Sequence, residues 1–104
     1  MKLLVVEDDR LLNNTLCYNL STAGYTVDSA MTKVAATHLC EKQDYDLIVL
    51  DIQMPVMDGY TFLNIVKQNP NMSSIPVIVM TQHESEENEI VALEHGATDF
   101  VAKP

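Results

Sequence analysis

Two of the apolar runs in this chain end in carboxylates. Glu7 and Asp8 follow the run Leu3–Val6, and Asp51 follows the run Leu47–Leu50. An ionised carboxylate next to a buried run is costly unless it is paired, hydrated or bound to a metal. Carboxylates held a few ångströms apart also repel one another, and a shared cation would offset that repulsion. The expected cation is Mg²⁺, since this ion prefers oxygen ligands and is often shared with a phosphate.

Two further runs end in polar groups that suit phosphate chemistry. Thr81 follows Val77–Met80, and Lys103 follows Phe100–Ala102. A carboxylate such as Asp51 can act as a nucleophile and form an aspartyl phosphate. A nearby ammonium would supply counter-charge, and a hydroxyl would donate a hydrogen bond to a phosphoryl oxygen. Each residue alone has a plainer role, as a turn cap, a helix cap or a surface amine, but together they favour a phosphoryl-binding site.

The elements that must position these groups alternate regularly. Runs rich in Val, Ile and Leu are typical of strands covered on both faces of a parallel sheet, and segments with helical spacing separate them. This alternation predicts a doubly wound α/β fold. In the flavodoxin-like order 2-1-3-4-5, the ends of strands one and three are neighbours, and ligands bind at the carboxyl ends of strands. The five expected strands are Leu3–Val6, Tyr25–Val27, Leu47–Leu50, Val77–Met80 and Phe100–Ala102.

Four helices are expected between the strands. Asp9 is the expected N-cap of the first helix, and Gly24 follows its end. The fourth helix is expected to begin near Ser85 and to end at Gly96. A fifth helix should follow the last strand, so we expect the domain to be C-terminally incomplete. The residues expected to face the core are Leu12, Leu16 and Leu20 in the first helix, Ala35, Ala36 and Leu39 in the second, and Phe62, Leu63 and Val66 in the third.

Composition narrows the classes of function. A chain of 104 residues fits one domain, and 15 acidic against 6 basic side chains give a net charge of −9. This charge repels nucleic acid, so we expect no direct nucleic-acid binding. No apolar run approaches the length of a membrane span or of a signal peptide, which predicts a cytoplasmic protein without a membrane partner. Cys17 and Cys40 match no zinc-ligand spacing and are expected to be free thiols.

The sequence resembles the receiver domain of two-component response regulators. The motifs that carry the resemblance are LLVVEDD at 3–9, DLIVLDIQMPVMDG at 46–59, IPVIVMT at 75–81 and GATDFVAKP at 96–104. Their order and spacing extend along the whole chain. The resemblance implies that residues 1–104 are one receiver domain that lacks its fifth helix. It also implies a phosphoacceptor module in a signalling phosphorelay rather than a turnover enzyme.

The resemblance assigns roles at the site. It implies that Asp51 is the phosphoacceptor, and that Mg²⁺ is held by Glu7, Asp8, Asp51 and the backbone carbonyl of Gln53. Asp9 lies one position beyond the acidic pair, so its expected role stays that of a helix cap.

The resemblance also assigns roles around the acceptor. It implies that Thr81 meets the phosphoryl oxygens, that Lys103 pairs with the phosphorylated carboxylate, and that Phe100 is the aromatic switch that moves with Thr81. Gln53 and His83 occupy the positions that modulate dephosphorylation in the family.

The same resemblance implies partners and leaves alternatives open. The implied phosphodonor is a sensor histidine kinase or a histidine phosphotransfer protein, and the implied dimer surface involves the fourth helix and the fifth strand. Gln82 departs from the small residue that is usual in the family, which keeps open a pseudo-receiver that binds proteins without phosphorylation. A phosphatase of the haloacid-dehalogenase type would need a second acid two residues after Asp51, where this chain has Gln53.

Overall fold

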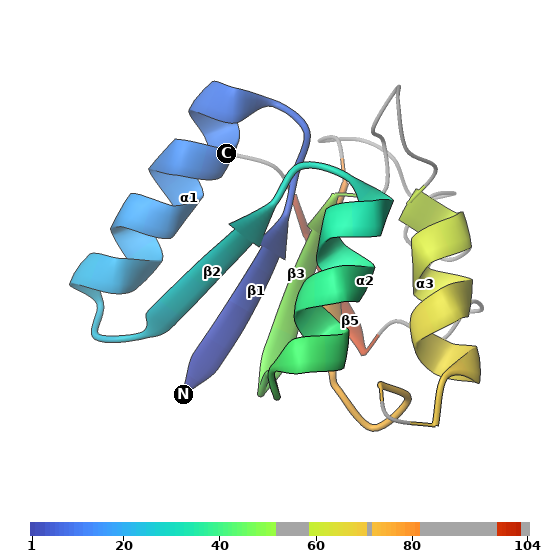
Figure 1. The fold of residues 1–104 in the computed structure, drawn as a ribbon. Helices are drawn as coiled ribbons and strands as arrows, with labels where there is room; N and C mark the ends of the chain where they lie inside the picture. Colours follow the sequence, from blue (N-terminus) through green and yellow to red (C-terminus); the bar gives the residue numbers. More distant parts are fainter. Residues whose placement is uncertain (52–58, 71, 82–97, 103–104) are drawn as a thin grey trace.

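The described strands form one parallel sheet with the order β2-β1-β3-β4-β5 (Figure 1). The computed structural model describes residues 1–51, 59–70, 72–81 and 98–102. In chain order the elements are β1 (Lys2–Val6), α1 (Arg10–Thr22), β2 (Thr26–Ala30), α2 (Lys33–Lys42), β3 (Leu47–Asp51), α3 (Gly59–Gln68), β4 (Val77–Thr81) and β5 (Asp99–Ala102).

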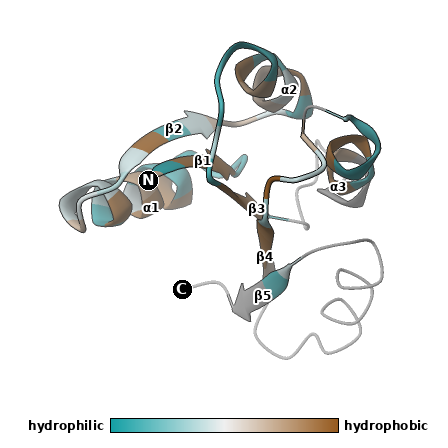
Figure 2. Ribbon diagram, turned by 90° about the horizontal axis from the view of Figure 1, so that it is seen from below, coloured by the Kyte–Doolittle hydropathy of each residue, from teal (hydrophilic) through white to brown (hydrophobic). Residues whose placement is uncertain are grey.

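Helices cover both faces of the sheet. Figure 2 shows α1 on one face and α2 with α3 on the other. This is the arrangement of a doubly wound fold, because each crossover between parallel strands carries a helix to one face or the other. The predicted α/β class and flavodoxin-like strand order are confirmed. The predicted fourth helix lies outside the described residues.

The main core lies between the sheet and the pair α2 and α3. Alternate residues of each central strand point to this face, because successive side chains of a strand alternate between faces. Phe62 of α3 is fully buried against them, and burying such a side chain contributes about 1.5–3 kcal/mol. The strand residues in this core are Leu4 and Val6 of β1, Ile48 and Leu50 of β3, and Val77 and Val79 of β4.

Strand β1 is apolar along its length because it is buried on both faces. Leu3 and Val5 point away from the main core, yet both are at most 2% exposed. Strand β2 is different, since it lies at the edge of the sheet and carries polar residues such as Asp28. The prediction of a strand at Tyr25–Val27 was right in place but ended too early, since the strand is Thr26–Ala30. Most of β2 is not fully buried, so its apolar signal is short.

The ends of α1 are as predicted. The Asp9 carboxylate accepts a hydrogen bond from the amide of Leu12 at 3.1 Å, which is the contact of an N-cap residue. After the helix, Gly24 has a φ of +103°, a left-handed conformation that glycine adopts without a steric penalty. These two residues fix where α1 begins and ends.

The predicted inner faces of the first two helices were partly wrong. Leu12, Leu16 and Leu20 of α1 are only partly buried. The buried residue of this helix is the polar Asn13, which is 3% exposed.

In α2 the buried residues are Ala36 and Cys40, whereas Ala35 is exposed. Leu39, which was also predicted to face the core, is partly buried and packs against it, so the prediction for α2 was wrong only at Ala35. In α3, Phe62, Leu63 and Val66 are fully buried, as predicted.

Candidate functional site

The carboxyl ends of β1 and β3 lie next to each other. The two strands are parallel neighbours with Val6 opposite Leu50. The next residue of each strand carries a carboxylate, Glu7 beyond β1 and Asp51 at the end of β3. Two acids that are 44 positions apart in sequence are therefore brought together by strand register alone.

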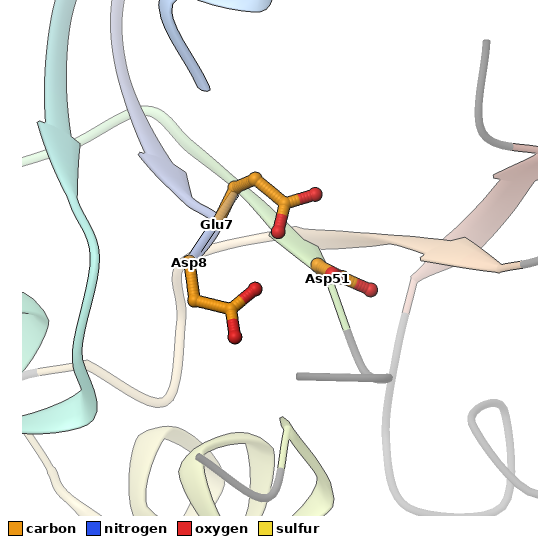
Figure 3. A group of neighbouring side chains, drawn as sticks. All are labelled: Glu7, Asp8 and Asp51. Carbon is orange, nitrogen blue, oxygen red and sulfur yellow. The ribbon is translucent and has the colours of Figure 1, made fainter. Parts of the chain in front are cut away.

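Glu7, Asp8 and Asp51 form one cluster (Figure 3). Each offers a carboxylate oxygen, and these three oxygens lie within 4.8 Å of one another. Glu7 is 0% and Asp51 1% exposed, whereas Asp8 is partly exposed. The cluster therefore reaches from the buried end of the sheet to solvent.

The cluster fits a hard divalent cation. Two full negative charges about 4–5 Å apart repel by about 3–4 kcal/mol at an effective dielectric constant of about 20. A cation among them turns this repulsion into attraction. Among the described residues the cluster offers three carboxylates, and oxygen ligands are those that Mg²⁺ prefers. The residues present thus fit the metal that the sequence suggested.

Hydrogen bonds hold the loop that carries Glu7 and Asp8. The amide of Glu7 donates to the carbonyl of Ala30 at 3.0 Å, which continues the pairing of β1 with β2. The amide of Asp9 donates to Oε2 of Glu7 at 3.2 Å. The side-chain amide of Asn13 donates to the carbonyl oxygen of Glu7 at 2.9 Å. Both neighbours of Asp8 in the chain are therefore tied to the fold.

Asn13 was missed at the level of sequence. Two features of the sequence could have pointed to it. Asn13 lies six residues after Glu7, and it stands between Leu12 and Leu16 of the predicted helix. The leucine spacing favoured a stripe that left Asn13 beside the core rather than in it. A polar residue next to a predicted core stripe, six residues after a candidate ligand, is the pattern that would have identified it.

The remaining predicted site residues are only partly described. Thr81 ends β4, one strand beyond Asp51, and pairs with Ala102 of β5. Phe100 lies in β5 opposite Val79. Their backbone positions bring Thr81 to the same edge of the sheet as Asp51. Gln53, His83 and Lys103 lie outside the described residues, as does Gln82.

Both cysteines are free thiols, as predicted. Burial raises the pKa of the Cys17 thiol. Burial also raises the pKa of Cys40 to about 11. At neutral pH both are therefore protonated, and neither resembles a reactive thiolate.

Within the part of the chain that the structure describes, none of the helices has the length and apolar character needed to span a membrane.

Comparison with known proteins identifies the family of this chain. The family model of the response regulator receiver domain matches residues 3–104. The chain belongs to the response regulator receiver domain family. Mg²⁺ binding and a phosphoaspartate are typical of this family. A receiver domain is a signalling module.

Similar proteins extend the comparison. The chain is 35% identical to the transcriptional regulatory protein HprR and 38% identical to the transcriptional regulatory protein BasR, both of Escherichia coli, along its whole length. It spans 45% and 46% of these two proteins, which is less than half of each.

Solved structures show the same fold. A response regulator from Chloroflexus aurantiacus superposes with a TM-score of 0.93 at 33% identity, over 99% of this receiver domain and 84% of that chain. The chemotaxis protein CheY4 of Vibrio cholerae gives 0.92 at 30% identity, over 99% and 86% of the two chains.

Proposed function

We propose that this receiver domain accepts a phosphoryl group on Asp51 from a phosphohistidine. The observation that carries the proposal is the position of Asp51, at the end of β3 and within 4.8 Å of the carboxylate oxygens of Glu7 and Asp8. The phosphodonor is a sensor histidine kinase or a histidine phosphotransfer protein. In the cytoplasm, the protein cycles between carboxylate and acyl phosphate and is a signalling module rather than a turnover enzyme.

The transfer exchanges one bond to phosphorus for another. An oxygen of the Asp51 carboxylate attacks phosphorus, the P–N bond to the donor imidazole breaks, and the imidazole leaves with the electron pair. The product is an acyl phosphate on Asp51. Hydrolysis reverses the charge change, because water attacks phosphorus, inorganic phosphate leaves and the carboxylate is restored.

Glu7, Asp8, Asp51 and the backbone carbonyl of Gln53 would hold the metal. When bound, Mg²⁺ supplies the positive charge that lets an anionic phosphoryl group approach three carboxylates. The residues of the chain do the positioning. Glu7 and Asp51 are nearly inaccessible to solvent, so their carboxylates are confined to one region, whereas Asp8 is partly open to it.

Thr81 and Lys103 are proposed to stabilise the phosphorylated state. The Thr81 hydroxyl would donate to a phosphoryl oxygen, and the Lys103 ammonium would pair with it. Phosphorylation adds about −1.5 to −2 charges, which is enough to bias two conformations of a nearby segment. Phe100 is the proposed switch that follows Thr81, and Gln53 and His83 are proposed to set the rate of hydrolysis.

The conformational change would alter the surface of the fourth helix and β5, through which we propose that the domain dimerises or meets its output partner. A transcriptional output is proposed for the longer protein, since HprR and BasR are named as transcriptional regulators. This segment itself, with a net charge of −9, is not proposed to touch nucleic acid.

We retain the prediction that a further helix completes the domain. Val49 of β3 and Ile78 of β4 are register partners and are both only partly buried. They point away from the main core, to the face that α1 covers near β1 and β2. A helix on this face would remove their remaining surface from water.

The direct test is chemical phosphorylation. Incubation with Mg²⁺ and acetyl phosphate should add one phosphoryl group to the intact protein, measured by mass spectrometry. The matched control is Asp51→Asn, which keeps the side-chain shape but removes the nucleophile and should show no added mass. An unmodified wild-type protein at saturating donor would contradict the proposal.

The alternative is a pseudo-receiver that acts without phosphate, favoured by the bulky Gln82. Beryllofluoride, which mimics a phosphoryl group on aspartate, separates the two functions. In the phosphoacceptor, NMR signals around Thr81 and Phe100 should shift when beryllofluoride and Mg²⁺ are added. A spectrum that does not change would favour the pseudo-receiver.

A further inference from the structure

A buried amide on α1 contacts the backbone that carries the acidic pair. Asn13 is 3% exposed, and its Nδ2 donates to the carbonyl oxygen of Glu7 at 2.9 Å and to that of Ala30 at 3.4 Å. The same Ala30 oxygen accepts from the amide of Glu7 at 3.0 Å. Asn13 therefore lies at the junction of three elements, the end of β1, the end of β2 and the start of α1.

The orientation of this amide is fixed by a second contact. The Cys17 thiol, one turn further along α1, donates to Oδ1 of Asn13 at 3.4 Å. Since a thiol and an amide nitrogen both donate, only one orientation of the amide satisfies all three contacts, with oxygen toward Cys17 and nitrogen toward Glu7. The burial of Cys17 keeps its pKa raised, so it remains a donor at neutral pH.

The hydrogen bond of Asn13 acts on the backbone that carries two residues of the acidic cluster, Glu7 and Asp8. Asn13 binds the carbonyl of Glu7, and that carbonyl belongs to the peptide unit that joins Glu7 to Asp8. The amide of Asp9 returns to the Glu7 side chain at 3.2 Å. The direction of the Glu7–Asp8 peptide thus depends on Asn13, and with it the direction in which both carboxylates leave the chain.

We propose that Asn13 is a positioning residue for the Mg²⁺ site. It fixes the peptide between Glu7 and Asp8 so that their carboxylates stay beside Asp51. This inference rests on the proposed function. Side chains that orient metal ligands change metal affinity by about 10–100-fold when they are replaced, although they never touch the metal.

The test compares Mg²⁺ affinity in variants that remove the amide. Asn13→Leu has a similar size but donates no hydrogen bond, and Asn13→Ala is a second variant in case leucine does not fit. Isothermal titration calorimetry should show a dissociation constant for Mg²⁺ raised about tenfold or more in the folded variant. Folding is checked separately by circular dichroism and urea denaturation in metal-free buffer.

The matched control is Tyr45→Phe. The Tyr45 hydroxyl donates at 2.7 Å to Asp28, the middle residue of β2, and Tyr45 is 5% exposed. This variant also loses one partly buried hydrogen bond and some stability. Its Mg²⁺ dissociation constant should equal that of the wild type. A folded Asn13→Leu or Asn13→Ala protein with wild-type Mg²⁺ affinity would overturn the inference and leave Asn13 a purely structural residue.

A measurement without metal separates the inference from the proposed function. Amide hydrogen exchange at Glu7 and Asp9 should be faster in metal-free Asn13→Ala than in metal-free wild type, whereas Tyr45→Phe should leave both rates unchanged. If wild-type protein binds no Mg²⁺, the proposed function fails, and these exchange rates still decide whether Asn13 holds the loop. Equal exchange rates in Asn13→Ala and wild type would overturn the inference on their own.

Discussion

At the scale of single residues, the chemistry of the site depends on three carboxylates that lie close together, since a single carboxylate would not form a metal site. Glu7 and Asp51 are nearly fully buried, and their oxygens lie within 4.8 Å of each other and of Asp8. Carboxylates held this close repel one another, and a shared cation offsets that repulsion. The cluster is therefore matched to a cation, and removing one charge should have opposite effects on the metal-free and the metal-bound protein.

Replacing Asp8 tests this balance. Asp8→Asn should stabilise the metal-free protein, by about 1 kcal/mol in free energy of unfolding, because one of three like charges is gone. Millimolar Mg²⁺ should stabilise this variant less than it stabilises the wild type, since a ligand that binds more weakly stabilises the folded state less. Urea denaturation with and without Mg²⁺ measures both. Equal Mg²⁺ stabilisation in the two proteins would exclude Asp8 as a ligand.

The sequence predicted that the three acids would lie together but did not identify the amide, and the two outcomes have different physical causes. Glu7, Asp8 and Asp51 follow apolar runs, and a parallel sheet brings the ends of neighbouring runs together whatever the details of packing. Asn13 depends on the rotation of α1 about its axis. Leucine spacing does not fix that rotation to within one residue, so the buried face could be identified only from the packed structure.

At the scale of elements, burial explains which boundaries could be predicted. The run Leu47–Leu50 matched β3 closely, because a central strand is buried and reads as unbroken apolar sequence. Edge strand β2 keeps polar residues that face solvent, so its apolar signal stopped at Val27 while the strand continued to Ala30. Helix starts were predictable where a side chain caps them, as Asp9 does for α1.

The cap of α1 can be tested apart from the acidic cluster. Asp9→Ala removes the bond to the amide of Leu12 and should lower the free energy of unfolding by about 1 kcal/mol. Asp9→Ser keeps an oxygen that can accept this bond and should lose clearly less. Both variants retain the backbone amide that binds Glu7, so phosphorylation by acetyl phosphate should persist. A serine variant as unstable as the alanine variant would show that the cap contributes little.

At the scale of the whole molecule, the two ends of the sheet have different roles. The carboxyl ends of β1 and β3 carry the acidic cluster. Away from this end, Lys2 at the start of β1 pairs at 3.8 Å with Asp28, the middle residue of β2, and Tyr45 donates to the same carboxylate. The carboxyl ends gather three acids that fit a metal ion. Ligand chemistry therefore concentrates at one edge, as is general for open α/β sheets.

Alkaline pH should destabilise the fold through Cys40. Burial raises its pKa from 9.0 to about 11, so between these values the unfolded chain loses the thiol proton while the folded chain keeps it. The free energy of unfolding should therefore be unaffected by this group below its ordinary pKa and fall as the pH rises above it, by about 1 kcal/mol near pH 10.

Tyr45 acts in the same direction at higher pH, because burial and its bond to Asp28 raise its pKa. Urea denaturation of wild type and Cys40→Ala at about pH 8 and about pH 10 isolates the contribution of the thiol. The variant should lose less stability over this interval. Identical losses would assign the alkaline sensitivity to other groups.

The central claim is that strand register joins two acidic segments into one Mg²⁺-dependent phosphoryl site. A crystal structure of the protein with Mg²⁺ and beryllofluoride tests it most directly. We predict beryllium bonded to a carboxylate oxygen of Asp51 and Mg²⁺ bound beside it by carboxylates of the Glu7–Asp8 pair. A structure with Asp51 unmodified, or with Mg²⁺ bound away from this cluster, would contradict the account.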